Sequence, residues 1–142
     1  MYTKMITLLF TLSIFFIFAS TWLFEGKQDY WIIKGSIGSQ KEWKFWGNAY
    51  ACSWLAFCAI GVTYITQSHP LLSILLLFIY LLVWNIAHDM SVGYYLTKNV
   101  FHLGSTGWDA KVAKIFQNGK IWLIVRLVWL FIATGFYLGL CR

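Results

Sequence analysis

Residues 71–92 read LLSILLLFIYLLVWNIAHDMSV, and they give the clearest indication of the fold class. Its first two thirds are almost wholly apolar, as in a helix that lies in the roughly 30 Å hydrocarbon core of a bilayer. Asn85, His88 and Asp89 then follow at helical offsets of three and four, so their side chains share one helix face. The stretch predicts a membrane-spanning helix over about 71–95 that carries a short polar stripe toward its C-terminal end.

Three further apolar runs, over about 5–24, 45–66 and 121–141, are each long enough to cross a bilayer. The second run and the helix at 71–95 are separated by a linker so short that they must form an antiparallel hairpin. The composition agrees, because 60% of the 142 residues are hydrophobic and only 11% are charged, whereas a soluble domain carries about a quarter. We therefore predict an all-α integral membrane protein, a single domain built as a bundle of four transmembrane helices.

The first run also admits a second interpretation, a cleaved signal peptide. Lys4 precedes it and small residues end it at 19–21. The large Ile17 and Phe18 stand where a cleavage site needs small residues, which favours a retained helix. Cleavage would leave three spans in the same orientation.

Two polar segments, 25–44 and 97–120, connect the apolar runs. Within the second, Thr106 and Asp109 match a helix start signal, and apolar side chains share one face of residues 107–118. This pattern predicts a short amphipathic helix in the membrane interface between the third and fourth spans, with an ordinary connecting helix as the alternative. Gly119 stands where a glycine would end that helix.

The lysines predict the orientation of the four spans. The two polar segments share one side of the membrane, while both termini and the hairpin share the other, which holds little beyond Lys4 and Arg142. Since Lys and Arg are retained on the cytoplasmic side, we expect both polar segments to be cytoplasmic, in a bacterial inner membrane or an equivalent one. The lysines of these segments are Lys27, Lys34, Lys41, Lys44, Lys98, Lys111, Lys114 and Lys120.

Arg126 is the charged residue inside the fourth apolar run. In an antiparallel pair of helices it lies in the same leaflet as Asp89, and an unpaired charge in the membrane costs about 2.5–3.5 kcal/mol. We therefore expect the two side chains to pair. Together with Asn85 and His88 they form either a structural clamp between two helices or a proton or ion site, since histidine titrates near neutral pH.

A metal site would recruit His88, Asp89 and His102, a ligand set that suits zinc or non-haem iron. The gap after Asp89 is not a recurrent ligand spacing, so we expect no metal. No other histidine lies within an apolar run to complete a haem site, and we expect no cofactor.

Small residues indicate where helices pack closely. Cys52 and Ala56 share one face of the run 45–66, and Gly135 and Gly139 form a G-x-x-x-G pair. The glycines lie on the opposite side of the fourth helix from the charged Arg126 side chain, so we expect them to contact either the first helix or a second protomer.

The sequence favours a non-enzymatic accessory or assembly subunit of a membrane complex, because there is almost no soluble mass. The alternatives are a proton- or ion-coupled transport component that uses the polar cluster, and a metalloenzyme at the membrane interface.

Expected partners are the lipid bilayer and other membrane subunits or further copies of the chain. Nucleic acid is not expected, since the net charge of +6 comes from cations beside apolar runs rather than from a basic stripe. The three cysteines form no C-x-x-C pair.

Overall fold

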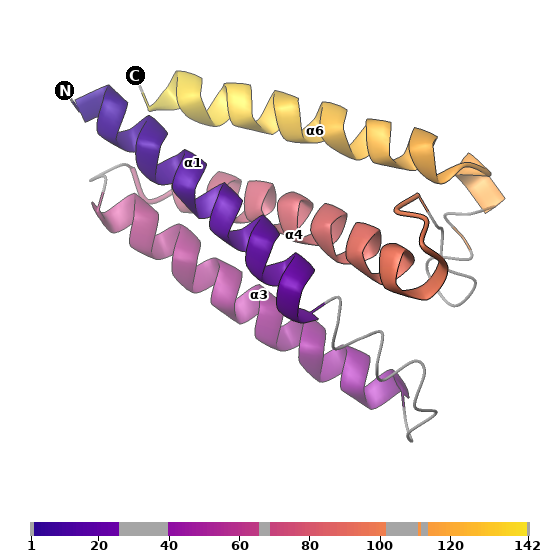
Figure 1. Ribbon diagram of the computed structural model, residues 1–142. Coiled ribbons are helices and arrows are strands. Elements are labelled where there is room, and N and C mark those ends of the chain that lie inside the picture. Colours follow the sequence, from indigo (N-terminus) through magenta and orange to yellow (C-terminus); the bar gives the residue numbers. More distant parts are fainter. Residues whose placement is uncertain (1, 26–39, 66–68, 102–110, 112–113, 142) are drawn as a thin grey trace.

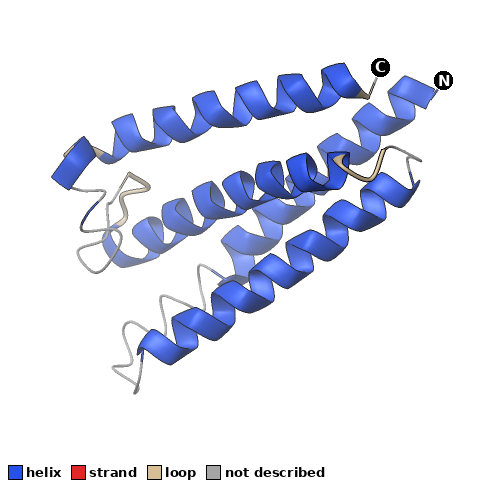
Figure 2. Ribbon diagram, turned by 180° about the vertical axis from the view of Figure 1, so that it is seen from behind, coloured by secondary structure: helices blue, strands red, loops and turns tan. Residues whose placement is uncertain are grey.

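The structure is a computed structural model that describes residues 2–25, 40–65, 69–101, 111 and 114–141. Within these residues every regular element is helical (Figures 1 and 2). Helix α1 continues directly into a short π-helical turn, η1, and the others are joined through connections. The elements are α1 (Tyr2–Ser20), η1 (Thr21–Glu25), α3 (Gln40–Ile65), α4 (Leu72–Thr97) and α6 (Gly119–Leu140).

Helix α4 is the centre of the arrangement. It packs against α1, η1, α3 and α6, whereas α1 and α3 touch each other only slightly. Figures 1 and 2 show α3 and α6 along two sides of α4, with α1 crossing it. Both termini lie at the same end of the molecule as the end of α3 and the start of α4, and the end of α4 lies beside the start of α6 at the other end. We call this second end the loop end.

Among the described residues, three helical segments are long and apolar enough to cross a membrane, which indicates a membrane location. They are Met5–Glu25, Leu72–Thr97 and Gly119–Leu140, and α3 contains a shorter apolar helix, Ala51–Ile65. Helix α3 begins at Gln40 rather than near residue 45, where its apolar run begins. The added residues are mostly Gln, Lys and Glu, which favour helix, so the helix continues beyond its apolar part.

The core lies where α1, α3 and α6 meet α4. Leu55, Leu76, Ile79, Tyr80 and Tyr137 are fully buried there. The rings of Phe10 on α1 and Tyr137 on α6 stack with their centroids 5.2 Å apart, which joins two helices that otherwise contact each other through α4. The hydroxyls of Ser13 and Tyr80 form a hydrogen bond of 2.6 Å between α1 and α4.

Replacement of Tyr80 by phenylalanine is expected to lower the free energy of unfolding, whereas the same replacement of Tyr137 is not. Tyr80→Phe should lower the free energy of unfolding by about 0.5–1.5 kcal/mol, because it removes a hydrogen bond inside the membrane. Tyr137→Phe, its matched control, should be neutral or stabilising, because the buried Tyr137 hydroxyl has no oxygen or nitrogen partner among the described residues. Unfolding in mixed micelles with increasing dodecyl sulfate, followed by far-ultraviolet circular dichroism, measures both. Equal losses would contradict the assignment of the hydrogen bond.

The small residues of α3 pack differently from the expectation. Cys52 is exposed and Ala56 is half-buried. The buried line is Ala51, Leu55 and Ala59, which faces α4 and is rotated by one residue. The prediction that Cys52 packs against a neighbouring helix is therefore wrong within this chain. The larger Leu55 side chain fills the contact with α4, and the Cys52 side chain lies on the exposed side of α3.

Gly135 and Gly139 lie on the exposed face of α6. A Cβ atom added at either position would meet nothing within 4 Å. Of the two contacts expected for this pair, the one with the first helix is therefore not made.

The predicted helix at 107–118 falls mostly outside the described residues, although residues 111 and 114–116 are helical. Gly119 does not end that helix; it is the first residue of α6. The left-handed conformation that commonly ends a helix is adopted by Gln117, at φ 50°. Asn118 then caps α6, since its side-chain oxygen accepts the Lys120 N–H at 2.8 Å.

Candidate functional site

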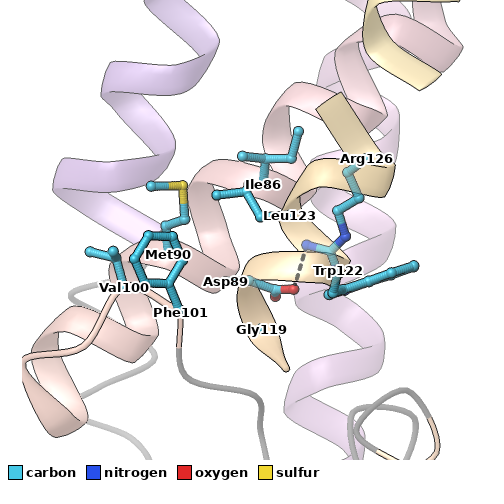
Figure 3. A pocket seen from close by; sticks show the side chains of 9 residues that line it. All are labelled: Ile86, Asp89, Met90, Val100, Phe101, Gly119, Trp122, Leu123 and Arg126. Carbon is cyan, nitrogen blue, oxygen red and sulfur yellow. Dashed lines mark ion pairs between the residues drawn. The ribbon is translucent and has the colours of Figure 1, made fainter. Parts of the chain in front are cut away.

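An ion pair joins α4 to α6 near the loop end. The Nη1 atom of Arg126 lies 2.7 Å from Oδ2 of Asp89, and Figure 3 shows the two side chains pointing toward each other. The antiparallel course of the two helices places these residues at the same level, although 37 positions separate them in the sequence. Arg126 is 8% exposed. An unpaired guanidinium among apolar side chains would be costly, and the Asp89 carboxylate neutralises its charge.

Two further groups surround the guanidinium. Its Nη1 also donates to the backbone carbonyl of Asn85 at 3.4 Å, and its central carbon lies 4.3 Å from the centre of the Trp122 ring. A cation over the face of an indole is attracted by the negative potential of the ring. Asn85 thus contributes its main chain to the site rather than its amide.

His88 lies on the other side of Asp89 and extends the polar cluster. Its Nδ1 is 3.5 Å from Oδ1 of Asp89, and its ring stacks on that of Trp84 at 5.4 Å. The Trp84 indole N–H donates a hydrogen bond to the carboxylate of Glu25, at the end of η1. The cluster therefore reaches from η1 across α4 to α6.

The sequence did not assign Glu25, Trp84 or Trp122 to this cluster. Trp84 and Trp122 each stand four positions before a member of it, His88 and Arg126, a spacing at which helical side chains meet. That spacing was the available signal. The polar composition of residues 25–44 predicts a connecting loop that begins at Glu25, but in the structure Glu25 is the last residue of η1. No local pattern indicates that η1 turns this carboxylate toward Trp84 on α4.

A small cavity of about 20 Å³ opens beside the ion pair. Asp89 and Arg126 form its polar wall, and the rest is lined by apolar groups of α4, the turn 98–101 and the first turns of α6 (Figure 3). About 10–15 Å³ on this measure accommodates one water molecule, provided that polar partners are present. The cavity has room for a water molecule on the ion pair, but not for an organic substrate.

The histidine expected to complete a metal site, His102, lies outside the described residues. Among the described residues no three His, Cys, Asp or Glu side chains converge on a point. His88 and Asp89 do lie together, yet Asp89 faces Arg126, and a nearby guanidinium opposes the binding of a cation.

The arrangement is best suited to fixing two helices to each other. Asp89 is held by a cation on one side and a histidine on the other, so each partner fixes its position. Apolar residues such as Leu72, Leu76 and Ile79 fill the bundle toward the opposite end.

No protein-family model matches the chain, and neither curated proteins nor solved structures show significant similarity to it.

Proposed function

We propose that the protein is a non-enzymatic membrane subunit that assembles with other membrane-embedded chains, or with copies of itself, through α6. The observation that carries the proposal is the position of α6, which packs on α4 and leaves most of its surface uncovered. The polar cluster serves this role as a clamp, because it fixes α6 on α4 in one register.

In this proposal all four long helices cross the membrane. Helix α3 has 26 residues, about 39 Å at 1.5 Å per residue, which exceeds a hydrocarbon core of roughly 30 Å. An even number of spans agrees with the two termini lying at one end (Figure 1). The excess of lysine in the segments 25–44 and 97–120 supports a cytoplasmic position for the loop end, in a bacterial inner membrane or an equivalent one.

The uncovered face of α6 has the features of a helix-packing surface. Gly135 and Gly139 leave a shallow strip on which another backbone can approach closely, as in G-x-x-x-G pairs of membrane helices. Large apolar side chains, including Val128 and Ile132, continue that strip along the helix and are at least half exposed. Such a strip gains van der Waals contact from a helix that it does not gain from mobile lipid tails.

The test is the mass of the particle obtained by gentle extraction from the membrane. The wild-type chain is expected in a particle larger than its own 16.5 kDa, and the paired substitution Gly135→Ile and Gly139→Ile is expected to release it as a monomer. Native mass spectrometry measures both and shows whether the partner is foreign or a second copy. The matched control, Phe136→Ile and Leu140→Ile, places the same residues one position further along and should keep the complex.

A monomeric wild-type particle would contradict the assembly role, as would a complex that survives in the glycine variant. Far-ultraviolet circular dichroism should show the same helix content in all three proteins, because a Cβ at either glycine meets nothing within 4 Å.

A second candidate function, proton or ion transport, is favoured by one observation. The Asp89 side chain is 35% exposed and lies on the wall of the cavity beside Arg126. Asp89→Asn, reconstituted in liposomes, should then abolish a proton or cation flux that the wild-type protein carries, while the protein remains folded. Wild-type liposomes that are no more permeable than empty ones would rule this function out.

A further inference from the structure

The junction between α4 and α6 at the loop end is a fixed unit. A Cβ atom added to Gly119 would lie 1.8 Å from the Phe101 carbonyl oxygen, so the backbones of the turn 98–101 and of α6 are in direct contact. Side chains hold the turn itself. The Asn99 N–H donates to Oγ1 of Thr97 at 3.3 Å, and the Phe101 N–H donates to Oδ1 of Asn99 at 3.0 Å.

Two exposed lysines belong to this junction. Lys98 caps the end of α4, and its Nζ lies 4.8 Å from the centre of the Tyr94 ring. Lys120 is the second residue of α6, and its Nζ lies 5.4 Å from the centre of the Phe101 ring. Each ammonium group is thus placed over an aromatic face. Because Phe101 ends the turn that begins at Lys98 and contacts the first residue of α6, both lysines belong to the same junction at the loop end.

No described carboxylate neutralises either lysine. The two carboxylates whose side chains are described, Glu25 and Asp89, bind Trp84 and Arg126 respectively. Lys98 and Lys120 therefore present two positive charges with no acidic partner among the described residues. A site of this charge attracts an anion.

The level of the junction identifies the chemical class of that anion. Lys98 directly follows the candidate span Leu72–Thr97, and Lys120 lies at the start of the span Gly119–Leu140. Both ammonium groups consequently lie at the edge of the hydrocarbon region, where phospholipid phosphates are found. The aromatic rings beneath them suit the same level, since such rings are enriched at the membrane interface.

We propose that the junction of Lys98, Phe101 and Lys120 binds the headgroup phosphate of an anionic phospholipid, with both ammonium groups donating to its oxygens. The proposal rests on the membrane insertion proposed above but not on the assembly role of α6. A lysine near the membrane surface contributes roughly a fivefold gain in affinity for anionic lipid, the factor that corresponds to about 1 kcal/mol.

The experiment is a titration of the purified full chain in detergent with phosphatidylglycerol, with lipid-bound protein counted by native mass spectrometry. Lys98→Gln together with Lys120→Gln should weaken binding about 25-fold, and each single variant about fivefold. Lys4→Gln is the matched control, because it removes the same charge near the opposite end of the bundle, and it should leave binding within about twofold. Phosphatidylcholine should bind the wild-type protein no better than phosphatidylglycerol binds the double variant.

Three results would overturn the proposal. An equal loss in the Lys4 variant would mean that net charge alone attracts the lipid. Equal binding of phosphatidylcholine would mean that the site does not distinguish an anionic headgroup from a zwitterionic one. Displacement of the lipid by millimolar inorganic phosphate would make free phosphate the ligand. If the double variant unfolds, the single variants decide the outcome. Assembly through α6 is scored separately by particle mass, so either proposal can fail without the other.

Discussion

Asp89→Ala is expected to lower the free energy of unfolding by about 2–3 kcal/mol, near the cost of an unpaired cation in a membrane helix. The substitution leaves the Arg126 guanidinium buried with the Asn85 carbonyl, at 3.4 Å, and the Trp122 ring. Neither group carries the negative charge that compensates a cation in an apolar setting. Unfolding with dodecyl sulfate in mixed micelles, followed by circular dichroism, measures the loss.

The control for this prediction is a double-mutant cycle. Arg126→Leu alone should cost less, about 1–2 kcal/mol, because Asp89 is more exposed than Arg126 and keeps His88 beside it. The double variant Asp89→Ala and Arg126→Leu should be more stable than Asp89→Ala alone, since no buried charge remains. Strictly additive losses would show that the two side chains do not stabilise each other, and the clamp would be ruled out.

Gly119→Ala is expected to destabilise the protein by about 2–3 kcal/mol, in the upper part of the range for added volume in a packed site. The new Cβ would lie 1.8 Å from the Phe101 oxygen and 2.7 Å from its carbonyl carbon. Both neighbours are backbone atoms, so no rotation of a side chain can relieve the overlap. The turn 98–101 and the start of α6 must separate, and the same unfolding measurement reports the cost.

Gly61→Ala serves as the matched control for Gly119. A Cβ at Gly61, which lies within α3 four residues before its end, meets nothing within 4 Å. There the change should raise stability by about 0.5–1 kcal/mol, because alanine favours helix over glycine. A loss at Gly61 as large as at Gly119 would mean that the close approach at Phe101 is not the cause.

The helical class and the membrane location could be predicted from the sequence, because long apolar runs have few alternatives in lipid. The contact between Asp89 and Arg126 could also be predicted: a charge inside such a run needs a partner at its own depth, and an antiparallel pair of helices offers few. Both predictions succeed because exposing long apolar runs to water, or leaving a charge unpaired in the membrane, costs so much free energy that few other arrangements are stable.

The details of packing could not be predicted in the same way. The face that α3 turns toward α4 depends on which side chains interlock, and Ala51 rather than Cys52 lies there. Gly119 has a role that only the tertiary structure explains, since the opposing Phe101 carbonyl comes from a distant segment. Glu25 likewise joins the polar cluster through η1, whose course toward α4 no local pattern indicates.

The central position of α4 has a consequence for the order in which the chain is built. The ribosome completes α1 and α3 before α4, yet these two early helices touch each other only slightly and find most of their packing surface on α4. Until α4 has been synthesised, α1 and α3 therefore lack most of the packing surface that they have in the complete chain. Helix α6 is synthesised after the surface of α4 on which it packs, so the ion pair between Arg126 and Asp89 can form only once most of the chain has been made.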